Sequence, residues 1–285
     1  MNYLAHYTKF EFFTNMLKGN VNSSEERHLT FWASSAYDMD DQTEMNYGYP
    51  LIQYILREYE KNPNLTKEQR LTELFNALSE IITRPSEKHF LPKTQTPFVV
   101  SFTQAFENNY MWENFGDKGK GVCLYFDADK IDDLSRKGNG SYFSNVVYID
   151  EKECDYEVLL PLVNIIIRKA IECHFLVPHL ENKSDIPLFK KVYLNSMCPV
   201  ISAFLKDGQF SREMETRLIF IRDESTSMCR EKENGKRVNY MKIEIPLNFL
   251  VGITVGPNLE KTNELEEICR EKNIKIIDKS EILLI

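Results

Sequence analysis

The sequence predicts an α+β fold, with β-rich segments toward both ends of the chain and a helical block between them. Strands and helices do not alternate in the regular way that a doubly wound parallel sheet requires. No internal repeat, low-complexity segment or sharp change of composition divides the 285 residues. We therefore expect a single domain over residues 1–285, with helical insertions at about 49–84 and 156–206.

The expected strands are short runs rich in β-branched and aromatic residues, bounded by turn residues. They cover residues 3–6, 29–33, 98–103, 121–126, 144–149, 215–221, 240–245, 250–255 and 274–277. Short helices are expected at 10–17, 110–115 and 259–272, where apolar residues recur with helical spacing. The first insertion is a helical pair split at Asn62-Pro63-Asn64, and the second contains helices at 156–175 and 186–206.

Composition excludes several classes of protein. The chain is 42% hydrophobic and 27% charged, as expected of a globular protein, and its net charge of -8 argues against a dedicated nucleic-acid binder. The six cysteines are scattered without a CxxC pair, which indicates reduced thiols rather than a disulfide scaffold. The first residues lack the pattern of a signal peptide, and the most apolar stretch, Leu159 to Val177, carries charges that would be costly in lipid. We expect a cytoplasmic protein with no membrane span.

Two candidate sites lie near the first strands. His6-Tyr7-Thr8 ends a short strand just before a helix, where a histidine can face a ligand or can be a core residue with one satisfied nitrogen. The segment from Ser34 to Glu44 follows the second strand and contains four carboxylates, two serines and Tyr37. A solvated acidic turn explains these residues as well as a binding loop does. The spacing is not that of a calcium loop, and no metal is expected.

Aromatic residues form the next candidate, Tyr110-Met111-Trp112, on a short helix between two strands. Trp112 has a large planar surface that suits ring stacking on a ligand, although the same area suits a core. Glycines at 116, 119 and 121 precede a strand, so they fit a hairpin-like turn better than a dinucleotide-binding loop.

The sharpest local signal is Glu213-Met214-Glu215-Thr216-Arg217, which runs into an apolar stretch. Alternate side chains of a strand share a face, so Glu213, Glu215 and Arg217 are expected to point the same way. Two adjacent carboxylates push their pKa values apart, which can separate acid and base roles. A pair of edge-strand carboxylates balanced by arginine is the structural alternative.

Taken together and in order, these motifs resemble the bacterial domain-of-unknown-function family 2971. The motifs that carry the resemblance are His6-Tyr7-Thr8, Ser34-Ser35, Asp40-Asp41-Gln42-Thr43-Glu44, Ser101-Phe102-Thr103, Met111-Trp112, Gly121 to Asp127 and Glu213-Met214-Glu215-Thr216-Arg217. Asp40 and Gln42 stand where the family usually has Asn and Pro, so the loop that holds Asp41 and Glu44 departs from the pattern.

The layout is also similar to that of the ADP-ribosyltransferase superfamily. This more distant resemblance implies a core of mixed, largely antiparallel sheets with a helical insertion, and NAD as substrate. It implies that Glu215 binds the ribose 2′-hydroxyl, that Glu213 orients or deprotonates the acceptor, and that His6 belongs to the catalytic set. The residues that it assigns to NAD binding are Tyr7, Thr8, Ser34, Ser35, Tyr37, Trp112 and Arg217.

Three functions are open from sequence. The first is an NAD-dependent ADP-ribosyltransferase or NAD glycohydrolase in a toxin or phage-defence setting, with an unknown protein, nucleic-acid or small-molecule acceptor. The second is a non-catalytic nucleotide- or peptide-binding sensor that uses the same cleft. The third is a hydrolase of another N-glycoside. The sequence has no GxSxG, P-loop or HExxH motif, which argues against serine hydrolases, NTPases and zinc proteases.

Overall fold

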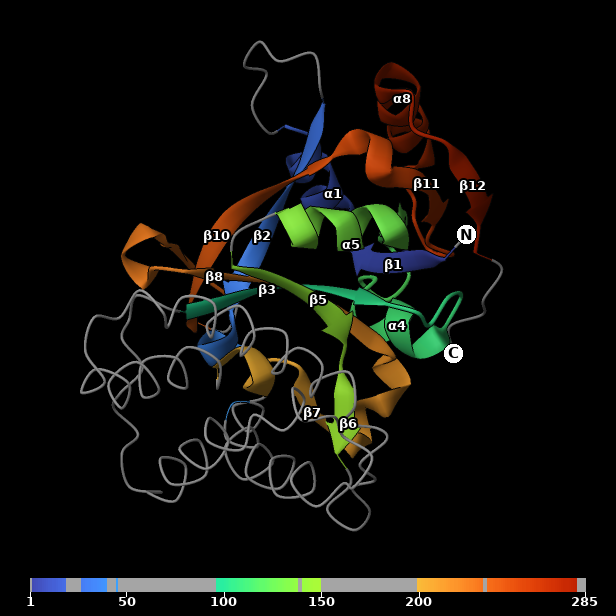
Figure 1. Cartoon of the computed structure of the whole chain (residues 1–285). Coiled ribbons are helices and arrows are strands. Elements are labelled where there is room, and N and C mark those ends of the chain that lie inside the picture. The colour runs from blue at the N-terminus through green and yellow to red at the C-terminus, as the bar shows by residue number, and fades with distance from the viewer. Residues whose placement is uncertain are drawn as a thin grey trace, which may run out of the picture.

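The computed structural model describes residues 2–18, 27–39, 45, 96–137, 140–149, 199–232 and 235–280 (Figure 1). The predicted insertion at 49–84, nearly all of that at 156–206, and the acidic residues Asp41 and Glu44 lie outside the described residues. The question of one domain over the whole chain is therefore left as a prediction.

Helices and strands mix along the described chain. The elements are β1 (Tyr3–Thr8), α1 (Phe10–Leu17), β2 (His28–Ser35), η1 (Ala36–Asp38), β3 (Thr96–Thr103), α4 (Asn109–Asn114), β4 (Val122–Asp127), α5 (Ala128–Lys137), β5 (Ser141–Asn145), β6 (Val147–Ile149), β7 (Leu205–Asp207), η4 (Gly208–Glu213), β8 (Glu215–Arg222), η5 (Glu224–Thr226), β9 (Met228–Glu231), β10 (Arg237–Pro246), η6 (Leu247–Phe249), β11 (Leu250–Val255), α8 (Thr262–Lys272) and β12 (Ile276–Lys279). Here η marks a short 3₁₀ helix. The α+β fold class predicted from the sequence is confirmed.

The main sheet branches at β3. Its strands follow the order β12-β11-β4-β1-β3-β2-β10-β9, and β8 pairs with both β3 and β5. Pairing is antiparallel throughout this sheet except between β11 and β12, and β6 and β7 form a separate parallel pair. The sheets are therefore mixed and largely antiparallel. One half of the main sheet contains β1, β4, β11 and β12, the other contains β2, β10 and β9, and both halves join β3.

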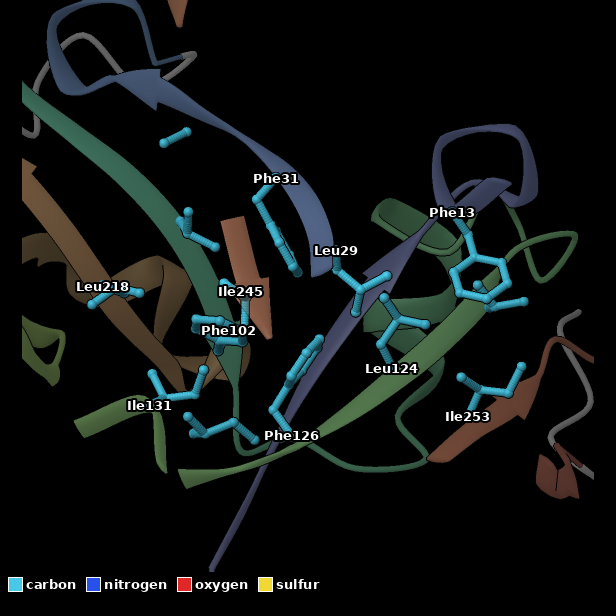
Figure 2. Close-up of a cluster of buried hydrophobic side chains, with 14 of the residues drawn as sticks. Phe13, Leu29, Phe31, Phe102, Leu124, Phe126, Ile131, Leu218, Ile245 and Ile253 are labelled. Atoms are coloured by element: carbon cyan, nitrogen blue, oxygen red, sulfur yellow. The ribbon is translucent and has the colours of Figure 1, made fainter. Parts of the chain in front are cut away.

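The inward faces of both halves share one hydrophobic core. Alternation along the strands places Phe31 of β2, Phe102 of β3 and Phe126 of β4 in this core, with ring centroids 5.6 to 6.2 Å apart. Figure 2 shows Phe31 of β2 and the two β4 residues Leu124 and Phe126 reaching into the same space. Burial of side chains of this size is the main favourable contribution to folding. The core therefore defines an inner face and an outer face for each half of the sheet.

Three sequence expectations need correction. The strand expected at 144–149 is two strands, because the chain leaves β8 after Asn145 and then pairs with β7. The helix expected to end at residue 206 gives way to β7, which begins at Leu205. Neither α5 nor β9 was expected, since α5 is mostly polar and β9 is a strand of only 4 residues that contains Arg230 and Glu231.

The glycine-rich turn before β4 is confirmed as a turn and has a packing role. A Cβ atom at Gly121 would lie 2.1 Å from the carbonyl oxygen of Thr8, so only glycine permits this approach to the end of β1. The thiols of Cys123, Cys229 and Cys269 are free, and the first and last are buried. Within the described ranges, no helix is long and apolar enough to span a membrane.

Candidate functional site

Four charged side chains meet on the outer face of β8, and we call them the charged quartet: Lys206, Glu213, Glu215 and Arg217. The ammonium of Lys206 lies 2.6 Å from Glu213 Oε2 and 3.3 Å from Glu215 Oε2. Arg217 donates from Nε to Glu215 Oε1 at 2.8 Å and from Nη2 to Glu215 Oε2 at 2.9 Å. All four side chains are buried, so two carboxylates and two cations neutralise each other inside the protein.

The two glutamates reach the quartet from different local structures. Glu215 begins β8, whereas Glu213 ends the 3₁₀ helix η4, and Met214 between them has a left-handed φ of 42°. The expectation that Glu213, Glu215 and Arg217 alternate along one strand is therefore wrong for Glu213. The left-handed Met214 ends η4 directly before β8, and Lys206 of β7 contacts both carboxylates.

Electrostatics keep Glu215 ionised. Burial by itself raises the pKa of its carboxyl, but the Arg217 guanidinium outweighs this effect with help from Lys206, and the pKa falls to about 2. The backbone N–H of Glu215 donates to the hydroxyl of Tyr148 at 2.7 Å, and Arg217 Nη1 donates to the carbonyl of Ala203 at 2.6 Å. These hydrogen bonds keep the Glu215 carboxylate ionised and hold Glu215 and Arg217 in place.

The carboxylate of Glu213 accepts fewer hydrogen bonds than that of Glu215. Its Oε1 accepts a hydrogen bond from the hydroxyl of Tyr110 at 3.4 Å, and its backbone oxygen accepts one from the hydroxyl of Thr103. Burial and the neighbouring Glu213 carboxylate raise the pKa of Tyr110. Tyr110 lies on α4, so the helix predicted to carry a ligand-stacking residue instead contributes a tyrosine to the edge of the quartet.

His6 lies on the opposite face of the sheet from the quartet. Its Nδ1 is 2.8 Å from the carbonyl oxygen of Ser101, and its ring packs edge-on against Phe31 and Phe102 of the core. Burial lowers the pKa of His6, which favours the neutral imidazole. Since Phe102 faces the core and the adjacent Thr103 pairs with Glu215, the sheet separates His6 from Glu215.

Trp112 and Tyr7 are core residues of a second, smaller cluster on the outer face. Trp112 is 0% exposed, and its ring meets that of Tyr7 edge-on at 4.8 Å. The hydroxyl of Tyr7 donates to the carbonyl of Ala105 at 3.1 Å, and burial raises its pKa. Thr8 is also buried. Neither ring face of Trp112 is therefore open to a ligand in this structure.

The comparisons with known proteins concern the segment that contains α4 and the quartet glutamates. Residues 111–218 match the family model "Protein of unknown function (DUF2971)". No curated protein and no solved structure matches the chain. The DUF2971 match begins at the Met111-Trp112 motif and ends just after Arg217, so it supports the resemblance for the later motifs.

Ser34, Ser35 and Tyr37 lie outside the DUF2971 match, at the end of β2 and in η1, and β3 lies between β2 and the quartet strand β8. Ser35 is buried, and its hydroxyl accepts a hydrogen bond from the backbone N–H of Tyr37 at 3.3 Å, which caps η1. Tyr37 is exposed. Ser34 faces outward on β2 opposite Tyr240 of β10. The predicted site residues thus fall into separate groups, and their catalytic and binding roles stay predictions.

Ser34 borders a surface that was not among the expected sites, here called the aromatic platform: Phe12, Trp32, Tyr240 and Arg230. The rings of Trp32 and Tyr240 lie 5.2 Å apart, and Phe12 lies 6.5 Å from Trp32. The guanidinium carbon of Arg230 lies 5.3 Å from the Trp32 ring centre and 5.7 Å from that of Tyr240. Phe12 is 40% exposed and Trp32 is 38% exposed.

Arg230 has no carboxylate partner among the described residues. One of its nitrogens, Nη2, is 3.5 Å from the hydroxyl of Ser34, while Nε is buried and finds no hydrogen-bond partner within the described ranges. Burial lowers the pKa of this arginine. A signal for this surface is present in the sequence. Leu29, Phe31 and Ala33 alternate as inward residues, so Trp32, which lies between Phe31 and Ala33, is expected to point outward.

Proposed function

We propose that this chain binds a nucleotide on the aromatic platform without converting it chemically. The observation that carries the proposal is the guanidinium of Arg230, which is held over two aromatic rings and has no carboxylate partner in the part of the chain that the structure describes. A desolvated cation without an internal partner favours an anionic ligand. Because the chain as a whole has a net charge of -8, an anion is attracted to this arginine locally and not by the charge of the whole protein.

The platform offers the two kinds of contact that a nucleotide needs. A base can stack on the exposed area of Trp32 and Phe12, and such stacking contributes about 1–3 kcal/mol per base. The phosphate can accept hydrogen bonds from the Nη groups of Arg230. Lys242 pairs with Trp32 across the strands and is exposed on the same face, so it adds a second cation.

The state of the charged quartet argues against turnover. An oxocarbenium-like transition state is stabilised by a carboxylate whose charge is not already compensated. Both oxygens of Glu215 accept hydrogen bonds from Arg217, and one also contacts Lys206. A ribose hydroxyl would have to displace one of these cations, and His6 lies across the sheet.

ADP-ribosyl transfer from NAD is the competing proposal, and one observation favours it. Glu213 and Glu215 do meet, at one lysine, and the pKa of Glu215 of about 2 keeps it ionised at neutral pH. This is the pair to which the resemblance assigns the chemistry. In that case Tyr110 and Glu213 would bind the molecule that accepts the ADP-ribosyl group, because the 3.4 Å hydrogen bond between them is long and easily replaced.

The test is a titration with AMP, ATP and NAD, followed by calorimetry, with nicotinamide release from NAD measured by chromatography. The variants are Arg230→Met, Glu215→Gln and, as a matched control, Arg222→Met, which also removes an arginine packed on an aromatic ring. We expect binding that weakens about tenfold or more only in Arg230→Met, since a hydrogen bond to a charged group contributes about 1.5–3 kcal/mol.

Two results would contradict the proposal. Nicotinamide release by the wild-type chain that disappears in Glu215→Gln would establish transfer or hydrolysis of NAD at the quartet. Equal affinity of wild type and Arg230→Met for all three nucleotides, or no binding at millimolar concentration, would remove the platform as the site. Thermal denaturation of every variant shows whether a lost signal reflects a lost fold.

A further inference from the structure

A hollow lies at the end of the main sheet away from the aromatic platform, where β1, β4, β11 and β12 meet. Its volume is about 800 Å³, which is within the range of small-molecule sites. It is separate from the quartet and from the aromatic platform, with which it shares no residue. The residues that line it are Tyr3, Glu107, Tyr125, Val251, Thr254, Lys275, Ile277, Asp278 and Lys279.

A chain of hydrogen bonds fixes one carboxylate in this hollow. Thr254 Oγ1 donates to the hydroxyl of Tyr125 at 3.4 Å, and that hydroxyl donates to Glu107 Oε1, also at 3.4 Å. The hydroxyl of Ser280 donates to Glu107 Oε2 at 2.6 Å. Glu107 adopts a left-handed φ of 43°, which is unfavourable for a residue with a side chain. Glu107 is thus held in place with lone pairs left for a further donor.

The residues that line the hollow include equal numbers of cationic and anionic side chains. Lys275 and Lys279 contribute two cations, and Glu107 and Asp278 contribute two anions. Among the described residues, neither lysine ammonium takes part in an ion pair. Opposite charges that share a cavity without pairing leave both signs available to one ligand.

Apolar side chains occupy the rest of the lining. Tyr3, Val251 and Ile277 are all more than one-third exposed, and Ile277 is the most exposed of them at 47%. All three line the same hollow. Three large apolar side chains that gather at one concave site are informative, whereas scattered exposed ones are not.

The strands deviate from regular pairing at this place. The β11–β4 register shifts between Leu250 and Gly252, and the β11–β12 register shifts between Ile253 and Thr254. A Cβ atom at Gly252 would lie 2.7 Å from Ile277, so glycine permits β12 to approach β11 closely. Bulges of this kind redirect side chains and are common beside binding sites.

We propose that this hollow binds a zwitterionic small molecule with an apolar body, of the class of aromatic amino acids. The ligand's ammonium group donates to Glu107, with Asp278 nearby in the lining. Its carboxylate accepts from Lys279, with Lys275 as a further cation in the lining. Its side chain covers Tyr3, Val251 and Ile277, and so removes from water the apolar surface that is exposed in the free protein. This site is independent of the nucleotide platform.

The experiment uses three probes that differ only in charge: L-phenylalanine, 3-phenylpropionate without the ammonium, and 2-phenylethylamine without the carboxylate. Binding is measured by calorimetry and by chemical-shift changes in the isotope-labelled chain. We expect L-phenylalanine to bind about tenfold more tightly than either single-charge probe, because each lacks one charge-assisted hydrogen bond.

Two variants locate the contacts. Glu107→Gln should weaken L-phenylalanine and 2-phenylethylamine about tenfold and leave 3-phenylpropionate unchanged, whereas Lys279→Met should weaken the two carboxylate probes only. Lys261→Met, which alters an exposed lysine elsewhere, is the control. Equal affinities for the three probes, tighter binding of 3-phenylpropionate than of L-phenylalanine, or no binding at millimolar concentration would each overturn the proposal. Nucleotide affinity at the platform is unaffected by any of these outcomes.

Discussion

The charged quartet and the aromatic platform use arginine in opposite ways. On β8, Arg217 is completely buried and gives its donors to Glu215 and Ala203, so its charge is used within the fold. On β9, Arg230 rests on Trp32 and Tyr240, and none of the described carboxylates pairs with it. The charges of a conspicuous motif, such as Glu213 to Arg217, can be neutralised by ion pairs within the fold. An arginine outside any motif, such as Arg230, can instead keep hydrogen-bond donors for a ligand.

The largest expected effect tests whether the quartet is structural. Glu215→Gln removes the charge that compensates Arg217 and Lys206, and breaking one side of a buried ion pair costs about 3–5 kcal/mol of unfolding free energy. Chemical denaturation measures the change. Asp132→Asn is the control, since it breaks the exposed pair with Arg136 and should cost less than about 1 kcal/mol. Similar small losses in both variants would contradict the compensating role of the quartet.

The two tryptophans offer a second test. Trp112 is fully buried against Tyr7, so Trp112→Ala should cost about 3–5 kcal/mol, whereas Trp32→Ala on the platform should cost less than about 1 kcal/mol. Because the chain has only these two tryptophans, each variant isolates the fluorescence of the other. Iodide should quench Trp32 strongly and Trp112 weakly. Equal quenching, or equal losses of stability, would show that the platform is covered in solution.

Acid should destabilise the quartet in a defined pH range. The pKa of Glu215 is lowered to about 2 in the folded chain from an ordinary value of 4.5. Its contribution is therefore fully present above pH 4.5 and is lost as the pH falls toward 2, amounting to about 3 kcal/mol. Denaturation by urea across this range measures the slope. Glu215→Gln should show a shallower slope than wild type, and parallel slopes would exclude Glu215 as the source.

The smallest expected effect sharpens the comparison of the two arginines. Arg230→Met should change the unfolding free energy by less than about 1 kcal/mol, because it replaces a guanidinium with an unsatisfied buried Nε by an apolar side chain of similar length. The same variant should lose nucleotide binding. Thermal denaturation alongside calorimetry separates these effects, and a large loss of stability would mean that Arg230 is a structural residue.

Much of the sheet could be predicted from the sequence because its strands are apolar and bounded by turns. The expected strand at 98–103 corresponds to β3, and that at 250–255 to β11. By contrast, α5 has few apolar residues on a highly charged background, and β9 has the sequence Met-Cys-Arg-Glu. Such segments are specified by what they pack and pair with, which the local pattern does not contain.

The candidate site was harder to predict than the fold. The pattern placed Glu213, Glu215 and Arg217 together, and the structure does bring them together, with Lys206 as the missing member. That lysine belongs to β7, whose position depends on pairing with β6 rather than on its own sequence. The first strand extends to Thr8, beyond the end expected at residue 6, and the parity of β1 directs His6 into the core with Leu4.

The branching of the sheet at β3 also bears on how the chain is synthesised. β1 pairs only with β3 and β4, and β2 only with β3 and β10, among the described strands. All of these partners are translated after residue 95, so both amino-terminal strands leave the ribosome with unpaired edges. Such edges are prone to association with other chains, which predicts that the nascent protein depends on early protection until β3 emerges.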